Sequence, residues 1–368
     1  MAILTDGQGN TRLIQEKGIK THCDYLRTRY ESMELGKFTS LLEFFGVSYD
    51  TEVETLWSPG GGALYYENRL IGAHGFVGGF TLNEDGSVNC MIDLPGEYWE
   101  GQDAIDTWRL FNGIKYTFQG ICSRIDLAID DPSYSLVPVD QMVEAWEQGN
   151  NFQFRKYTYI VSGNSPEEMK ATYNFGSRES GRYTRIYDHD GECLRHETEF
   201  KRQYAQVIFD EIYELKREDF GGYDNLRETE EAGWGVEDTP FAIGIQQKMA
   251  SLVVGAIDFR SREAYKDSSR VGHRDSDRLY FYQKYIDKIQ ASHTRVRASQ
   301  RARSLGRTVD WFKRQCGATL ALIASSFENV REFRAWVGDF VLAQESKMNK
   351  LQRLWVDELR RRPNLLII

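Results

Sequence analysis

Two segments of the sequence place carboxylates at every second position, the spacing that puts side chains on one face of a β-strand. The first segment puts Arg124, Asp126 and Asp130 on one face, and the second puts Glu197 and Glu199 on one face. Carboxylates from two neighbouring strands suit Mg²⁺ or Mn²⁺, which are hard cations that prefer oxygen ligands. An alternative interpretation is that Arg124 neutralises Asp126, Asp130 only ends its strand, and the second segment is an ordinary exposed strand face.

The segment 176–188, between these acidic strands, is rich in glycine, arginine and serine. Alternation puts Tyr183, Arg185 and Tyr187 on one face of a predicted strand. A tyrosine that attacks a phosphodiester must lose its proton, and the phosphate charge must be neutralised, which an arginine and a metal ion together achieve. The chain has 20 tyrosines, most of which we expect to be packed aromatics, so spacing alone does not single out Tyr187.

Composition narrows the classes of protein that the chain could be. Its 368 residues carry 46 Lys and Arg against 55 Asp and Glu, a net charge of -9. This acidic balance excludes a protein that coats nucleic acid through bulk charge. The five cysteines are scattered without a C-x-x-C pair, which argues against a zinc site and fits reduced thiols. No signal peptide or membrane-spanning run is present, so the sequence predicts a cytoplasmic protein without a membrane partner.

Patterning along the chain predicts an α+β fold. We expect a flexible arm over 1–18, a catalytic domain over 19–290 with a central antiparallel sheet flanked by helices, and a helical C-terminal region over 291–368 for DNA binding or oligomerisation. A hairpin is predicted from 182–200, because Asp190-Gly191 lies between two strand-like runs. The β-branched run 251–259 also predicts a strand.

The order of these motifs resembles that of a known family. The resemblance is carried by the segments 124–131, 175–180, 185–188 and 195–201, with weaker matches at 23–26, 255–260 and 307–315. Together they resemble the replication initiation factor (Rep_trans) family of rolling-circle plasmids, to which the relaxases of some integrative conjugative elements are similar. The similarity spans roughly residues 20 to 320.

The resemblance implies an HUH-endonuclease-like fold that cuts one DNA strand and keeps a 5′-phosphotyrosine link. Tyr187 matches the nucleophile of the family, and Asp126, Asp130, Glu197 and Glu199 match its acidic positions around a divalent metal, Mg²⁺ or Mn²⁺. The His-hydrophobic-His motif of the wider superfamily is missing. His189 stands where family members often carry Lys, and we consider a solvent-facing turn histidine and a proton donor as its alternatives.

Predicted partners follow from the same resemblance and from basic residues. The partners are single-stranded and hairpin origin DNA, a host or element helicase because the chain has no P-loop, and a possible second copy in a homodimer. A conjugative relaxase and a non-catalytic DNA-binding protein are the alternative functions. The basic run after residue 294 is either a DNA-contacting surface or a solvated helix face. The predicted DNA contacts are Ser177, Arg178, Arg182, Lys201, Arg301, Arg303 and Arg307.

Overall fold

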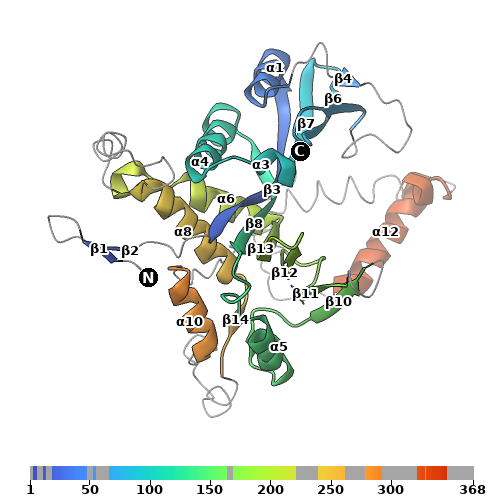
Figure 1. Cartoon of the computed structure of the whole chain (residues 1–368). Helices are drawn as coiled ribbons and strands as arrows, with labels where there is room; N and C mark the ends of the chain where they lie inside the picture. The colour runs from blue at the N-terminus through green and yellow to red at the C-terminus, as the bar shows by residue number, and fades with distance from the viewer. Residues whose placement is uncertain are drawn as a thin grey trace. The chain divides into compact units, whose positions relative to one another are not determined.

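The computed structural model describes ten stretches of the chain (Figure 1). They are residues 3–5, 11–13, 19–47, 53–54, 66–163, 169–220, 239–261, 278–291, 321–327 and 329–345. The chain divides into two compact units, Met1–Ala298 and Ser299–Ile368. In the second unit the helix α12 spans Val330–Glu345, and in the first a short hairpin pairs β1 (Ile3–Thr5) with β2 (Thr11–Leu13). No helix among the described residues is long and apolar enough to cross a membrane.

A ten-stranded sheet organises the first unit, with the strand order β10-β11-β12-β13-β8-β3-β7-β6-β5-β4. All its strand pairs are antiparallel. The predicted α+β arrangement with an antiparallel sheet is therefore confirmed. The strands are β3 (Lys20–Glu34), β4 (Val53–Glu54), β5 (Asn68–Ile71), β6 (Val77–Leu82), β7 (Ser87–Leu94), β8 (Ile121–Asp131), β10 (Tyr157–Ser162), β11 (Lys170–Gly176), β12 (Arg182–His189) and β13 (Cys193–Lys201).

Helices cover one face of the central strands. α6 and α8 both pack on β8 and β13, α8 also packs on β3, and α4 lies against α6 and α8. They bury Ile125, Leu127 and Ile129, the apolar side chains that alternate along β8. The α-helices of this unit are α1 (Leu35–Phe44), α3 (Gly96–Trp99), α4 (Ala104–Asn112), α5 (Val139–Glu147), α6 (Gln203–Tyr213), α8 (Pro240–Val254) and α10 (Tyr280–Lys288). Two short strands, β9 (Asn151–Phe152) and β14 (Asp258–Phe259), pair with each other outside the large sheet.

The predicted hairpin joins β12 to β13. Asp190 and Gly191 both have positive φ, 56° and 79°. This is the turn geometry that matches the twist of two antiparallel strands, and glycine adopts it without steric cost. The Asp188 carboxylate accepts the amide of Gly191 at 2.6 Å. The turn fixes the register in which Tyr187 lies opposite Arg195 and Arg185 opposite Glu197.

The predicted strand over 251–259 is wrong for most of its length. Residues up to Val254 belong to the helix α8, and only Asp258–Phe259 is extended. The helix begins at Thr239, whose hydroxyl accepts the amide of Ala242. Nearly all of its C-terminal half is buried, so burial of this half of the helix overrides the β-propensity of its valines.

A buried histidine links the sheet to α10. His196 is fully buried on the helix-facing side of β13, and its Nδ1 lies 2.9 Å from the Tyr285 hydroxyl. The two rings stack at a centroid distance of 5.9 Å. Burial lowers the pKa of His196 to about 3, so the side chain is neutral in the folded protein at neutral pH.

The protein should lose stability in acid because of His196. The unfolded chain takes up a proton near pH 6.5 whereas the folded chain does so only near pH 3, so stability is complete above 6.5 and falls between these values. We expect His196→Gln to remove about 2 kcal/mol of the difference in unfolding free energy between pH 7 and pH 5. Urea unfolding at both pH values measures it. The exposed His74→Gln is the control, and an equal pH dependence of wild type and His196→Gln would contradict the assignment.

Candidate functional site

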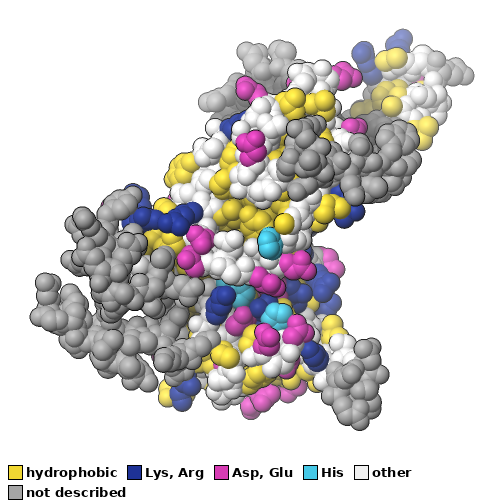
Figure 2. All heavy atoms as spheres, turned by 45° about the horizontal axis from the view of Figure 1, so that its top comes forward, with side chains coloured by type: hydrophobic (Ala, Val, Ile, Leu, Met, Phe, Trp, Pro, Cys, Tyr) yellow, Lys and Arg dark blue, Asp and Glu magenta, His cyan; other side chains and the backbone are white. Residues whose placement is uncertain are grey.

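The face of the sheet opposite the helices carries polar and charged side chains, and we call it the polar face. Antiparallel partners point to the same side of a sheet, so the register assigns its members. In the space-filling view, basic, acidic and histidine side chains gather together on one part of the surface (Figure 2). The polar face consists of His22, Tyr25, Arg27, Arg124, Asp126, Asp130, Tyr183, Arg185, Tyr187, Arg195, Glu197, Glu199 and Lys201.

Tyr187 shares a carboxylate with Arg185 on this face. The Tyr187 hydroxyl donates to Glu197 Oε2 at 2.7 Å, and the Arg185 guanidinium binds Glu197 Oε1. Glu197 is 1% exposed. Burial, followed by the charge and hydrogen bond of Glu197, raises the pKa of Tyr187. The phenol is therefore neutral at physiological pH, and its proton already points at a buried carboxylate.

A second charge cluster lies beside the first, between β8 and β13. Arg124 binds both oxygens of Asp126, at 3.0 and 2.6 Å, and reaches Glu199 at 3.0 Å. Lys201 also pairs with Glu199, and Arg124 lies over the Tyr25 ring at 4.0 Å. Burial raises the pKa of Asp126, and the charge of Arg124 opposes that rise. The pairing of Arg124 with Asp126 agrees with the alternative interpretation of this strand.

The third cluster joins β3 to β8 and β13 through one arginine. Arg195 binds both oxygens of Asp130, at 2.7 and 3.0 Å, and Asp24 at 2.7 Å. The two nitrogens of His22 lie 3.8 Å from Asp24 and from Asp130. Burial alone would raise the pKa of Asp24, but the neighbouring His22 side chain and the charge of Arg195 outweigh it, so the pKa lies below its usual value.

The four predicted metal ligands do not form one cluster. Asp126, Asp130, Glu197 and Glu199 are each paired with an arginine, two of them through both oxygens. In the part of the chain that the structure describes, no group of three or more His, Cys, Asp or Glu side chains could hold a metal ion. The donor set in this arrangement does not fit a divalent metal, because guanidinium groups take the positions that a cation would neutralise.

The predicted DNA contacts lie in three places. Lys201 is on the polar face and donates to the backbone oxygen of Arg178 at 2.6 Å, in the turn between β11 and β12 that also holds Ser177. Arg182 points to the helix-facing side, where it bonds Gln153 at 2.7 Å. Arg301, Arg303 and Arg307 lie outside the described residues.

Three residues of β3 that contact these clusters were missing from the predicted site. His22, Asp24 and Tyr25 belong to β3, far from β8 in sequence but adjacent to it in the sheet. The register shifts between Cys23 and Tyr25, so a bulge brings Asp24 to Arg195 while Tyr25 still lies opposite Asp126. The sequence held two signals there, the weak family match at 23–26 and the alternation along His22-Cys23-Asp24. Neither of them revealed which strand lies beside this segment.

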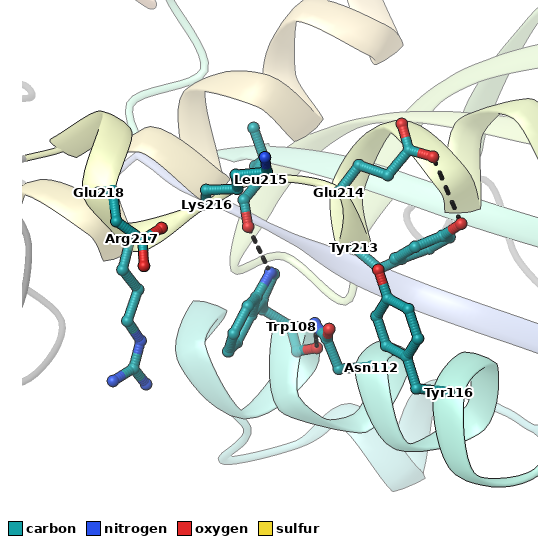
Figure 3. Close-up of a pocket in the computed structure, with 9 residues that line it drawn as sticks. All are labelled: Trp108, Asn112, Tyr116, Tyr213, Glu214, Leu215, Lys216, Arg217 and Glu218. Atoms are coloured by element: carbon teal, nitrogen blue, oxygen red, sulfur yellow. Dashed lines mark hydrogen bonds between the residues drawn. The ribbon is translucent and has the colours of Figure 1, made fainter.

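A pocket on the helical layer lies apart from these clusters (Figure 3). It has a volume of about 460 Å³ and is lined by residues of α4, the end of α6 and the following turn. Trp108 donates from its indole nitrogen to the Leu215 oxygen at 3.1 Å, and Tyr116 meets Tyr213 edge-on. None of the predicted site residues lines this pocket. Most of those that the structure describes lie on the polar face, which is therefore the candidate site.

Comparison with known proteins bears on residues 120–219. This segment matches the replication initiation factor family (Rep_trans). The predicted resemblance to that family is confirmed. The matched segment runs from β8 to α6 and includes Tyr187 together with all three charge clusters except their β3 members.

A solved structure described as the rolling circle replication initiator protein from Geobacillus stearothermophilus is similar to the chain. It is 15% identical, with a TM-score of 0.47, and the alignment covers 76% of this chain and 100% of that one. No curated protein matches the chain. The resemblance to the replication initiation factors therefore depends on the sequence match over 120–219.

Removal of Arg195 should destabilise the fold. Arg195→Met leaves the largely buried Asp24 and Asp130 without a counter-charge, and we expect a loss of about 3 kcal/mol of unfolding free energy. Arg109→Met is the control, because its pair with Asp106 is exposed and is expected to cost less than about 1 kcal/mol. Urea unfolding measures both. Equal losses in the two variants would show that the cluster does not hold β3 to the sheet.

Proposed function

We propose that this chain nicks and rejoins one DNA strand at an origin of rolling-circle replication, through a 5′-phosphotyrosine formed on Tyr187. The observation that carries the proposal is the position of Tyr187. Its hydroxyl lies on the polar face, bonded to Glu197 and next to Arg185, inside the segment that matches the replication initiation factors.

The chemistry requires an exchange of one phosphate ester for another. The Tyr187 oxygen attacks the phosphorus, the bond between phosphorus and the 3′-oxygen breaks, and the strand is left with a free 3′-hydroxyl. Attack by that hydroxyl on the phosphotyrosine reverses the reaction and rejoins the strand. Because each step makes one ester bond and breaks one, the nick stores the energy needed for rejoining.

The polar face supports this reaction through its cations. Arg185 lies beside the nucleophile, with its Cζ 5.9 Å from the Tyr187 ring centre. The Arg185 side chain is 25% exposed, so part of its guanidinium can donate to a phosphate oxygen. Arg178 and Lys201 lie at the end of the same face, where they extend the cationic surface along a bound strand.

A requirement for Mg²⁺ or Mn²⁺ stays a prediction from the family resemblance. The arrangement of the four acids offers no cluster for the ion among the described residues. A conjugative relaxase would perform the same reaction on a transfer origin, and nothing on the polar face favours that substrate over a replication origin.

Removal of the Tyr187 hydroxyl tests whether this residue is the nucleophile. A 3′-labelled library of random single strands, incubated with the protein and Mn²⁺, should yield a covalent protein–DNA adduct on a denaturing gel. Tyr187→Phe should abolish the adduct because it removes only the attacking atom. The matched control is Tyr183→Phe, on the same strand face, whose hydroxyl bonds Asn174 instead. Adduct formation by Tyr187→Phe would disprove the proposed nucleophile.

The cationic end of the polar face is tested by salt dependence. Arg178→Gln should weaken single-strand binding and lower the slope of log affinity against log salt by about 1, since one phosphate contact is lost. Arg182→Gln removes an equal charge four residues along the chain but on the helix-facing side, and we expect its slope to match wild type. Fluorescence anisotropy at several salt concentrations measures the slopes. Equal slopes for all three proteins would remove Arg178 from the DNA contacts.

A further inference from the structure

Glu197 links the Tyr187 hydroxyl to the Arg185 guanidinium, because each of these groups binds one of its two carboxylate oxygens. Glu197 Oε2 accepts the phenolic proton at 2.7 Å, and Glu197 Oε1 binds Arg185. Both oxygens of Glu197 are therefore engaged by groups of the proposed reaction centre. Glu197 matched an acidic position expected near a metal, but its contacts are those of a base that is positioned by an arginine.

We propose that Glu197 takes the proton of Tyr187 during strand cleavage, holds it while the DNA is covalently attached, and returns it on rejoining. The inference rests on the proposed function of Tyr187. As the bond between the Tyr187 oxygen and phosphorus forms, the phenolic proton moves to Glu197 Oε2. The departing 3′-oxygen keeps its electron pair and takes a proton from water. On rejoining, the 3′-hydroxyl loses a proton to water and Tyr187 leaves with the proton held by Glu197.

The need for such an acceptor follows from the environment of the phenol. The phenol carries its proton in a hydrogen bond of 2.7 Å to Glu197 Oε2, and this proton must leave before the oxygen can bond to phosphorus. A neutral phenol is a poor nucleophile and requires a base within hydrogen-bond distance. Among the described side chains, Glu197 is the only carboxylate that accepts a hydrogen bond from that hydroxyl.

Arg185 couples proton transfer to charge neutralisation. While Glu197 is ionised, the Arg185 guanidinium is paired with it. Once Glu197 is protonated that ion pair loses its negative partner, and the guanidinium charge becomes available to the phosphate. The unpartnered Nε of Arg185 is buried beside the same groups. The positive charge that Arg185 offers to the phosphate therefore increases at the moment when negative charge develops on the phosphate.

Other charges face Glu197 from each strand packed beside it. On β13 itself these are Arg195 and Glu199, and across the sheet they belong to β8 and β3. Arg195 and Arg124 pair with the nearby acids and not with Glu197. The counter-ion of Glu197 is therefore Arg185. The set that faces Glu197 is Arg185, Tyr187, Arg195, Glu199, Asp126, Asp24 and His22.

The test varies the acidity of the nucleophile in the presence and absence of the base. The probe is the strand that wild type selects from the random library, and the measurement is the single-turnover rate of adduct formation. We expect Glu197→Gln to slow adduct formation by roughly 100-fold or more, a usual size for loss of a general base. Replacing Tyr187 in that variant by a difluorotyrosine, which ionises more readily, should restore about 10-fold or more of the lost rate.

A purely structural role of Glu197 would give a different result. If Glu197 only positions its neighbours, the more acidic nucleophile leaves the slow rate of Glu197→Gln unchanged, and the inference is overturned. A wild-type rate in Glu197→Gln overturns it as well. Asp188→Asn is the matched control, because Asp188 follows Tyr187 in the sequence but its carboxylate accepts the amide of Gly191 in the turn. Its rate should stay within about 3-fold of wild type, well inside the loss expected from a missing base.

Two further variants keep the outcome interpretable. Glu197→Asp retains a carboxylate but moves it back by one methylene, so an intermediate rate is expected and a rate as low as that of Glu197→Gln counts against the proposal. This variant also provides the test if Glu197→Gln does not fold. Tyr187→Phe separates the two levels of the argument, since an adduct in that variant refutes the nucleophile, whereas the Glu197 variants refute only the base.

Discussion

Among the described elements, the helices that cover strands β8 and β13 lie on the face opposite the charged side chains. Ile125, Leu127 and Ile129 are completely buried against α6 and α8, which fixes the register and the facing of the whole central sheet. A slip of one residue in β13 would move Glu197 into the helix layer and His196 onto the polar face. The apolar side of the sheet therefore holds the polar side in position.

Charge compensation is the second requirement of this arrangement. Five carboxylates on or beside the polar face, from Asp24 to Glu199, are all bound by arginine. A carboxylate that loses its partner in such a place is costly, because water does not replace the lost interaction. The arginines thus stabilise the acids in the resting protein, and the same side chains present positive charge to a polyanionic ligand.

Much of the site was visible in local sequence pattern. Period-2 alternation gave the faces of β8, β12 and β13, and Asp190-Gly191 gave the hairpin that pairs Arg185 with Glu197. The same alternation places Arg182 and Tyr183 on different faces of the strand. The prediction that Arg182 contacts DNA together with the residues of the polar face therefore conflicted with the predicted strand itself. The contribution of β3 was not predictable in this way, because pairing of His22 with Ala128 joins segments more than 100 residues apart and requires a bulge. The helix α8 was misread because its valines favour strands locally, while complete burial favours the helix.

The placement of β12 within the sheet has a mechanical consequence. β12 is hydrogen-bonded to β11 on one side and to β13 on the other. If DNA becomes joined to Tyr187, any tension along that DNA is transmitted directly to the backbone of β12. Two flanking ladders share such a load over many hydrogen bonds at once, whereas an edge strand would peel away one bond at a time. A covalent link at this position would therefore be held by two hydrogen-bonded ladders of the sheet.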